Sequence, residues 1–330
     1  MQLKRIGKSE VTVTEIAFGA WAVGGWMWGG TDYKLSVRAI ERAIDLGMTT
    51  IDTAPAYGFG LSEKIVCDAI KGKRDKVQIL TKYGLRWDTD KGKFFFPTVS
   101  NEGKPIRTHK YAAKSAVLKE CEESLERLGI DCIDLYQIHW PDPTTPIEET
   151  MEAIDILIQQ GKIKASGVCN YGVDEMKIAD SVVSLASNQV PYSMVKRDIE
   201  NEMVPFCLEN EIGILAYSPL NRGVLTGKIT PGYQFNEGDT RSNLPNFKGE
   251  NLTQINHFLQ RIKPIADDRK ISLTQLVINW TLKQPGITCV LVGARSPEQV
   301  DENIKAADFD LTGEEIETIN RELDKLRLDV

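Results

Sequence analysis

The fold of this chain is decided by three stretches of sequence, TTIDTAPAYG (49–58), VQILTK (77–82) and IDLYQIHWP (133–141). Each begins as a short apolar run, and short apolar runs bounded by turn residues are typical of buried strands. Each run ends in a side chain that can take part in acid–base chemistry: Asp52 followed by Tyr57, then Lys82, then His139. We therefore predict three strands with a carboxylate, a phenol, an ammonium and an imidazole at or just beyond their carboxyl ends.

The same pattern of a short apolar run followed by a helical period continues along the whole chain. The predicted strands are EIAFG (15–19), TTIDT (49–53), VQILT (77–81), IDLYQI (133–138), IKASGV (163–168), LASNQV (185–190), GILAYS (213–218) and TCVLVG (288–293). Apolar residues at helical spacing predict amphipathic helices over 37–44, 117–128 and 147–158. Eight strand–helix units are the number found in a closed (β/α)8 barrel.

A doubly wound open sheet is the alternative fold. Dinucleotide-binding versions of that fold carry G-x-G-x-x-G directly after an early strand, and this string does not occur in the sequence. We therefore predict an α/β fold of the (β/α)8 TIM-barrel type, formed by one domain over residues 1–330. QLKRI (2–6) and VTVTEIA (11–17) predict an N-terminal β-hairpin. Residues 84–109 and 219–250 predict long loops after the third and seventh strands, over the mouth of the barrel.

Composition excludes several classes of partner. The net charge is −7, with Lys and Arg interleaved with Asp and Glu, so a nucleic-acid surface is not expected. The six cysteines are scattered without a C-x-x-C pair, and no metal site is predicted. The sequence shows neither a signal peptide nor an apolar run of the roughly 20 residues that span a bilayer. We expect a soluble, cytoplasmic protein that acts on a small molecule, with no indication of its oligomeric state.

In a barrel of this type the residues at the strand ends surround one pocket, which brings the four polar side chains together. Tyr57 is the natural proton donor to a carbonyl, but an unperturbed phenol has a pKa of about 10. A lysine such as Lys82 at ~4 Å contributes about 4 kcal/mol toward the phenolate at an effective dielectric of ~20, which lowers that pKa. Asp52 keeps Lys82 charged, and His139 orients the carbonyl oxygen.

Each of these residues also has a purely structural interpretation. Asp52 could cap a loop, Lys82 could end a strand in solvent, Tyr57 could belong to a turn, and His139 could be a core histidine. The catalytic interpretation is favoured because three consecutive strand ends carry acid–base residues.

At these residues the chain resembles the aldo-keto reductase family. IDTAPAYGFGLSE (51–63) is similar to the family's D-T-A-x-x-Y-G signature, ILTKYG (79–84) to its strand-end lysine, and IDLYQIHWPDP (133–143) to its L-Y-x-x-H-W-P segment. The resemblance implies a (β/α)8 barrel that binds NADPH without a Rossmann domain and reduces aldehydes or ketones to alcohols. It also implies a catalytic tetrad of Asp52, Tyr57, Lys82 and His139, in a bacterial branch near the potassium-channel beta subunits.

The resemblance further implies residues that bind the cofactor. Asn170 and Gln189 would bind the nicotinamide carboxamide, Tyr217 would stack on its ring, and Ser218, Leu220 and Arg222 would follow the pyrophosphate. Glu302 and Asn303 would lie at the adenine, Arg295, Ser296 and Gln299 at the ribose 2′-phosphate, and Gly19 and Trp21 would complete the site. We expect the substrate pocket to be lined by Trp21, Trp28, Trp87 and Trp140. For Phe94, Phe95 and Phe96, packing in the core and covering the pocket are equally open.

Two other functions remain open at this point. One is an NADPH-binding regulatory or redox-sensing subunit with little turnover, although channel beta subunits commonly have Asn where this chain has His139. The other is a hydrolase or isomerase on the same fold, because fold does not determine chemistry. A metal-dependent version of the latter is not favoured, since the chain has three histidines and one of them ends a predicted strand.

Overall fold

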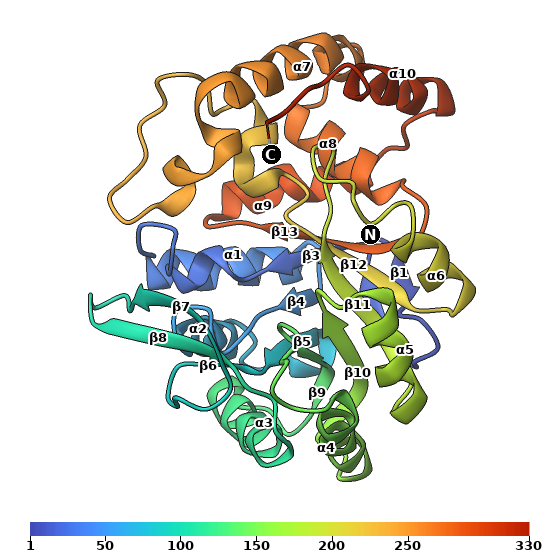
Figure 1. The fold of residues 1–330 in the computed structure, drawn as a ribbon. Helices are drawn as coiled ribbons and strands as arrows, with labels where there is room; N and C mark the ends of the chain where they lie inside the picture. Colours follow the sequence, from blue (N-terminus) through green and yellow to red (C-terminus); the bar gives the residue numbers. More distant parts are fainter. Residues whose placement is uncertain (330) are drawn as a thin grey trace.

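Eight parallel strands close into a barrel in the computed structural model, which describes residues 1–329 (Figure 1). The barrel strands are β3 (Ile16–Gly19), β4 (Thr50–Asp52), β5 (Gln78–Tyr83), β9 (Ile133–Ile138), β10 (Ile163–Cys169), β11 (Leu185–Pro191), β12 (Gly213–Tyr217) and β13 (Ile287–Gly293). They follow one another around the barrel in chain order, and β13 pairs with β3 to close it. The predicted fold class and all eight predicted strands are confirmed.

Helices surround the barrel strands. They are α1 (Tyr33–Asp45), α2 (Leu61–Ala69), α3 (Lys114–Leu128), α4 (Ile147–Gln159), α5 (Val173–Val182), α6 (Met203–Glu209), α7 (Gly249–Asp268), α8 (Leu273–Leu282), α9 (Pro297–Ile304) and α10 (Gly313–Leu323). Several begin with a side-chain cap: Asp32 accepts a hydrogen bond from Leu35 N at the start of α1, and Ser272 forms a capping box with Gln275 at the start of α8. The three predicted helices correspond to α1, α3 and α4.

The predicted N-terminal hairpin is present and closes one end of the barrel. Strands β1 (Leu3–Arg5) and β2 (Thr12–Thr14) pair antiparallel, with Leu3 opposite Thr14. Ile6, Val11 and Val13 of the hairpin region are buried in a cluster with interior residues of the barrel strands, among them Leu80 and Leu135. This apolar plug fills the barrel interior at the amino ends of the strands, so an open site is left at the carboxyl ends.

The segment after β5 is more regular than the sequence indicates. Residues 84–110, which we call the flap, contain a three-stranded antiparallel sheet of β6 (Leu85–Arg86), β8 (Pro105–Lys110) and β7 (Lys93–Val99), in that order. The long insertion after the third barrel strand is present as predicted, but it forms a small sheet and not an irregular loop. The polar, Gly-containing turn residues that suggest a loop lie between the strands, and the run KFFFPTV forms the free edge strand β7, where a proline is tolerated.

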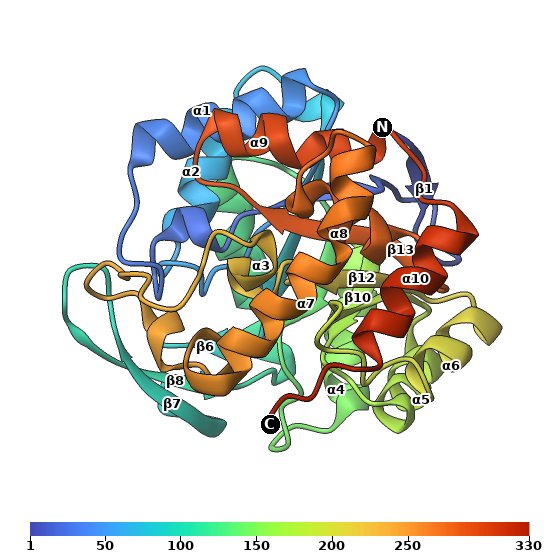
Figure 2. The same ribbon diagram turned by 90° about the horizontal axis from the view of Figure 1, so that it is seen from above.

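The segment after β12 is mostly irregular, as predicted. Residues 219–248, which we call the strap, contain three short 3-10 helices, η3 (Asn221–Thr226), η4 (Thr240–Asn243) and η5 (Pro245–Phe247), before α7 begins. The flap and the strap project from the same side of the molecule in both views (Figures 1 and 2).

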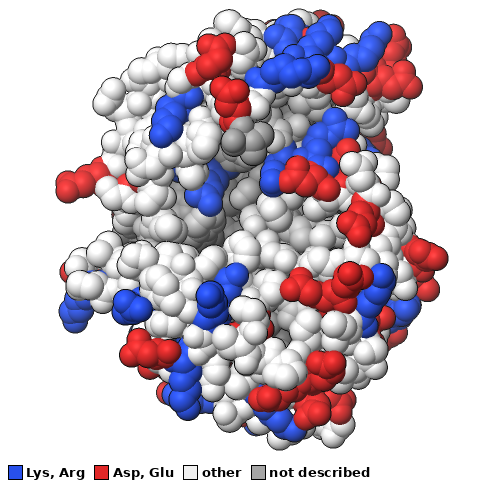
Figure 3. Space-filling model, viewed as in Figure 1, with Lys and Arg blue, Asp and Glu red and all other residues white. Residues whose placement is uncertain are grey.

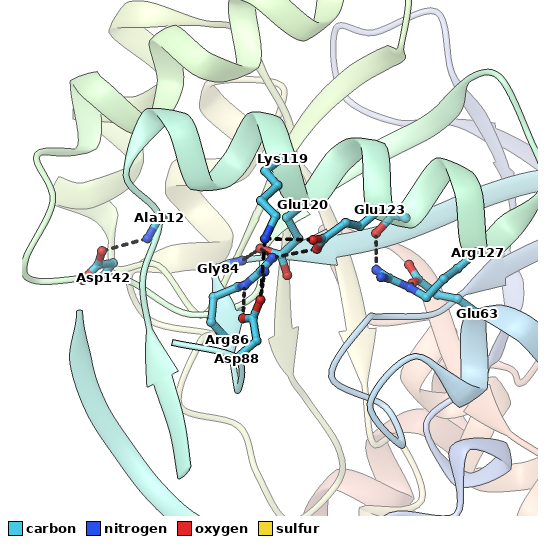
Figure 4. A network of polar contacts seen from close by, with 11 residues as sticks. Glu63, Gly84, Arg86, Asp88, Ala112, Lys119, Glu120, Glu123, Arg127 and Asp142 are labelled. Atoms are coloured by element: carbon cyan, nitrogen blue, oxygen red, sulfur yellow. Dashed lines mark hydrogen bonds and ion pairs between the residues drawn. The ribbon is translucent and has the colours of Figure 1, made fainter. Parts of the chain in front are cut away.

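A buried polar network fastens the flap to helix α3 (Figure 4). Gly84 has φ +83°, a conformation that favours glycine, and its N–H donates to Glu120 Oε2 at 2.9 Å. Two residues on, the Arg86 guanidinium lies 3.4 Å from Glu120 Oε2 and 3.2 Å from Glu123 Oε2, and it also pairs with Asp88. Gly84 and Arg86, at the start of the flap, are thus held on α3 by the carboxylates of that helix.

The main apolar core is continuous across the chain. Its buried residues run from Ile16 to Leu323 and include contributions from the barrel strands and the surrounding helices. The C-terminal segment is tied to α7, because Asn251 Nδ2 donates to the Asp329 carbonyl at 2.7 Å. This continuity supports one domain, which stays a prediction. Within residues 1–329, no helix has the length and apolar character needed to cross a bilayer.

The buried carboxyl group of Glu120 predicts a pH-dependent stability. Burial raises the pKa of Glu120 to about 7, because desolvation penalises the carboxylate more than Arg86 and the Gly84 N–H stabilise it, while Glu63 adds a further increase. A carboxyl group whose pKa is raised on folding stabilises the folded state below its unfolded pKa, and this contribution disappears as the pH rises through 7. We expect the free energy of unfolding of the wild type, relative to Glu120→Gln, to fall by about 3 kcal/mol between pH 5 and pH 8.

Urea unfolding of both proteins at several pH values measures this difference. Glu126→Gln is the matched control, since Glu126 is exposed on the same helix. Parallel pH profiles for the wild type and Glu120→Gln would contradict the assignment.

Candidate active site

A cavity of about 640 Å³ lies at the carboxyl ends of the barrel strands. Flap residues such as Phe95 and Phe96 and strap residues such as Arg222 and Phe235 line it. In the space-filling view a hollow is visible between the strap and the β7–β8 hairpin (Figure 3).

Strand alternation places the polar side chains in the barrel interior. On β5, Leu80 belongs to the interior apolar cluster and Lys82 follows two residues later, so both face inward. On β9, Leu135 and Gln137 are related in the same way, and Lys82 and Gln137 are direct partners in the strand register. The polar layer that contains Lys82 therefore lies directly above the apolar plug.

Asp52 and Lys82 form an ion pair in this layer. Lys82 Nζ donates to Asp52 Oδ2 at 2.7 Å, and the two side chains are 1% and 4% exposed. Lys82 also donates to the Thr53 carbonyl at 2.9 Å. Burial alone would lower the pKa of Lys82, but the Asp52 carboxylate more than offsets this and raises it above its ordinary value. The lysine is therefore cationic at neutral pH.

Two amides complete the coordination of Asp52. Gln189 Nε2 donates to Asp52 Oδ1 at 2.8 Å, and Gln137 Nε2 approaches the same oxygen at 3.4 Å. Strands β4, β5, β9 and β11 are thus joined through one carboxylate, which fixes the position of Lys82.

Tyr57 and His139 lie beside this pair and face the cavity. Lys82 Nζ is 4.9 Å from the centroid of the Tyr57 ring, and the Tyr57 and His139 rings meet edge to face with centroids 5.5 Å apart. A Cβ added to Gly24 would lie 2.8 Å from the Tyr57 carbonyl carbon and oxygen, so the close approach of this backbone requires glycine. The four predicted acid–base residues are brought together as the sequence indicates.

The protonation states differ in part from the expectation. Burial raises the pKa of Tyr57 to about 12, although Lys82 acts to lower it. The expectation of a net decrease was wrong, because Asp52 neutralises much of the Lys82 charge and the phenol is desolvated. Burial and the Lys82 charge hold the pKa of His139 well below its usual range. At neutral pH the site therefore contains a phenol and an uncharged imidazole.

Three residues were expected to contact a nicotinamide. They form hydrogen bonds with one another, with Asp52 or with the backbone of His139. Asn170, with φ +60°, donates through Nδ2 to the His139 carbonyl at 3.1 Å and accepts from the Tyr217 hydroxyl at 3.0 Å. Gln189 donates through Nε2 to Asp52 Oδ1. These hydrogen bonds hold the three side chains in place, and all three line the cavity.

Cations line the outer part of the cavity. The Arg222 guanidinium lies 4.9 Å from the centroid of the Trp21 ring. Arg295 donates to the carbonyl oxygens of Trp28 at 3.2 Å and Gly30 at 2.8 Å. Among residues 1–329, neither arginine has a carboxylate within 4.0 Å, so both remain available to an anionic ligand.

Most predicted site residues line the cavity. Those that do are Gly19, Trp21, Trp28, Asp52, Tyr57, His139, Trp140, Asn170, Gln189, Tyr217, Ser218, Leu220, Arg222, Arg295, Gln299, Glu302 and Asn303. Lys82 lies behind Asp52 and Tyr57, and Ser296 is the N-cap residue of α9 outside the lining. Trp87 is also outside the lining, and its ring packs edge to face against Phe59 with the ring centroids 5.4 Å apart.

Sequence reasoning missed the contribution of the strap beyond Arg222. Arg241 lines the cavity, pairs with Asp239 at 2.7 Å and lies 4.8 Å from the Trp28 ring centroid. Asp239 in turn forms an isolated β-bridge with Trp28. The sequence did contain a signal for this contribution: two aromatic residues in YQF (233–235), followed by the basic residue Arg241. Within the described chain, no cluster of three or more His, Cys, Asp or Glu residues is arranged to hold a metal.

Comparisons with known proteins agree with this geometry. The sequence model of the family described as "Aldo/keto reductase family" matches residues 15–324. Aldo-keto reductase YhdN of Bacillus subtilis is 39% identical over 97% of this chain and 93% of the relative. The NADH-specific methylglyoxal reductase of Escherichia coli is 36% identical over 96% and 97%. The solved glycerol dehydrogenase of Gluconobacter oxydans superimposes with a TM-score of 0.88 at 36% identity, covering 99% of this chain and 97% of that one.

The buried ion pair predicts a strong coupling between its partners. Asp52→Asn leaves the Lys82 ammonium buried without a counter-charge, and we expect the free energy of unfolding to fall by about 3–5 kcal/mol. The double variant Asp52→Asn/Lys82→Met removes both charges and should lose clearly less than the sum of the two single variants. Urea unfolding of the wild type, the two single variants and the double variant measures this coupling in a double-mutant cycle.

Asp267→Asn serves as a control, because it disrupts the exposed Lys263–Asp267 pair and should change stability by less than about 1 kcal/mol. Additive effects at Asp52 and Lys82 would rule out the coupling.

Proposed function

The chain belongs to the aldo/keto reductase family, and on that premise we propose that it reduces aldehydes or ketones to alcohols with a nicotinamide dinucleotide as hydride donor. The observation that carries this proposal is the position of Tyr57, a phenol at the cavity wall beside the Lys82 ammonium and the His139 imidazole. When bound, the dinucleotide supplies the hydride; the protein residues supply the proton and the geometry.

Tyr57 is the proposed proton donor. It is a phenol at neutral pH, so its proton is available to the oxygen of a carbonyl that accepts hydride. His139 is uncharged and can orient that oxygen through a ring nitrogen. The Lys82 cation stabilises the phenolate that remains after proton transfer, and Asp52 keeps the cation in position.

The cavity residues fit a dinucleotide. Arg222 and Arg295 are cations without carboxylate partners in the described part of the chain, as phosphate groups require. We propose that Asn170, Gln189 and Tyr217 hold the nicotinamide end. We assign Gly19, Trp21, Ser218, Leu220 and Arg222 to the ring and pyrophosphate, and Arg295, Ser296, Gln299, Glu302 and Asn303 to the adenosine end.

We propose NADPH as the preferred cofactor. Arg295 suits the ribose 2′-phosphate because a guanidinium binds phosphate in a bidentate manner. Its bonds to two carbonyl oxygens pre-orient the side chain and leave further N–H groups free. The methylglyoxal reductase of Escherichia coli is described as NADH-specific, and Arg295 is the residue on which we base the opposite preference for this chain.

We further propose that the substrate is a small carbonyl compound and that the protein works in the cytoplasm. Trp21, Trp26, Trp28, Phe96 and Trp140 give the cavity an aromatic wall suited to an apolar substrate body. All six cysteines are unpaired, which is typical of proteins from a reducing compartment.

Tyr57→Phe tests the proton donor. We expect kcat for aldehyde reduction with NADPH to fall by about 10²- to 10⁴-fold, with NADPH binding, followed by nucleotide fluorescence, unchanged. Because the pKa of Tyr57 is raised to about 12, the phenol stays protonated and its titration should not reduce wild-type reduction rates between pH 6 and pH 9.

Tyr83→Phe is the matched control, since Tyr83 is a buried phenol on β5 outside the cavity lining. Near-full reduction by Tyr57→Phe would remove Tyr57 from its proposed role.

Arg295→Ala tests the cofactor preference. We expect KM for NADPH to rise by about tenfold or more and KM for NADH to change little, because NADH lacks the 2′-phosphate. Initial rates with both cofactors measure the ratio. Arg42→Ala, which removes an exposed ion pair with Asp301, should leave both KM values unchanged. Equal losses with the two cofactors would argue against a 2′-phosphate contact.

A further inference from the structure

The flap carries one cation beside the cavity wall that the proposed reaction does not use. Lys110 is the last residue of β8, and its half-buried side chain lies between two aromatic rings. Its Nζ is 4.4 Å from the centroid of Phe95 and 5.0 Å from that of Trp140. Both rings line the cavity, and Trp140 directly follows His139 in the chain. Lys110 is not itself one of the residues that line the cavity, but its ammonium lies against two rings that do.

The charge of Lys110 is not compensated by a close carboxylate. Within residues 1–329, no carboxylate oxygen lies within 4.0 Å of its Nζ. Asp142 and Glu175 are the acidic residues that act on it at longer range. Both are engaged elsewhere: Asp142 accepts from Ala112 N at 2.9 Å, and Glu175 accepts from Gly172 N at 2.7 Å.

Burial lowers the pKa of Lys110, and Glu175 and Asp142 only partly oppose this. Aromatic faces attract an ammonium but supply no negative charge, so an anion beside Lys110 would gain a charge-assisted hydrogen bond. An anionic ligand group would therefore be a favourable partner for Lys110, which has no close carboxylate in the described part of the chain.

The other face of the same sheet provides an internal comparison. Arg107, three residues before Lys110, lies 4.5 Å from the centroid of Phe94, and Phe94 also packs against His109. Alternation along β8 puts Arg107 and His109 on the face opposite Lys110. Phe94 is exposed and is not among the cavity residues, unlike Phe95. The flap thus has a cation on an aromatic ring on each face, and the Lys110 face is the one that meets the cavity wall.

We propose that Lys110 is a specificity-determining residue that favours carbonyl substrates carrying a carboxylate at the end remote from the reacting carbon. This inference rests on the proposed reductase function and names the substrate class of that site. The aromatic wall accommodates the body of the substrate, and Lys110 binds its carboxylate. The residue acts on binding, so its removal should change KM for anionic substrates and leave kcat largely unchanged.

Two pairs of aldehydes test this, each matched in shape and differing in charge: 4-carboxybenzaldehyde with 4-methylbenzaldehyde, and succinic semialdehyde with butanal. For Lys110→Met we expect KM of at least one carboxylate aldehyde to rise by about 10- to 100-fold, with the values for its neutral partner within about twofold of wild type. Lys110→Arg should retain most of the preference, and Arg107→Met, the matched control, should behave as wild type.

Equal effects of Lys110→Met on charged and neutral aldehydes, or no effect on either carboxylate, would overturn the proposal while leaving the reductase function intact. Quenching of tryptophan fluorescence by 4-carboxybenzaldehyde gives a second readout that does not require turnover. If the wild type reduces none of the aldehydes, the reductase proposal fails, and a Kd for 4-carboxybenzaldehyde that is unchanged in Lys110→Met would then overturn the Lys110 proposal separately.

Discussion

The ion pair between Asp52 and Lys82 is the interaction on which the rest of the site depends. A buried charge is tolerated only when it is paired and fully hydrogen-bonded, and here one carboxylate receives the ammonium and the amides of Gln189 and Gln137. Because these partners come from different barrel strands, the pair requires the barrel register to be correct. The pair also places the Lys82 ammonium beside Tyr57, and the Asp52 carboxylate reduces the electric field of that ammonium at the phenol. The result is a phenol that keeps its proton at neutral pH although a cation lies beside it.

The cavity itself is made by segments outside the barrel, and each is fastened to a rigid element. The flap is held on α3 through Glu120 and Arg86, while Trp26 Nε1 of the β3–α1 connection donates to Thr98 of the flap at 2.9 Å. The strap meets the same connection through the bridge between Trp28 and Asp239. The connection between β3 and α1 therefore contacts both coverings, which makes it the common support of the cavity walls.

Much of the fold could be predicted because the eight barrel strands are short, apolar and regularly spaced. The convergence of Asp52, Tyr57, Lys82 and His139 could be predicted because the strand ends of a barrel surround one pocket. The sheet in the flap could not be predicted, since its strand β7 has the sequence KFFFPTV, with a proline and no clean alternation, between turns rich in Gly and charged residues. The pKa of Tyr57 was predicted in the wrong direction because the sequence shows the charge of Lys82 but neither the depth of burial nor the share of that charge neutralised by Asp52. The bonds of Arg295 to the Trp28 and Gly30 carbonyls depend on a contact across more than 260 residues, which no local pattern indicates.

The hairpin plug has a consequence for access to the site. Ile6, Val11 and Val13 close the barrel interior at the amino ends of the strands. The barrel is therefore a cup and not a pore, as is usual for this fold. A ligand reaches the Asp52 layer only from the side on which the flap and the strap lie.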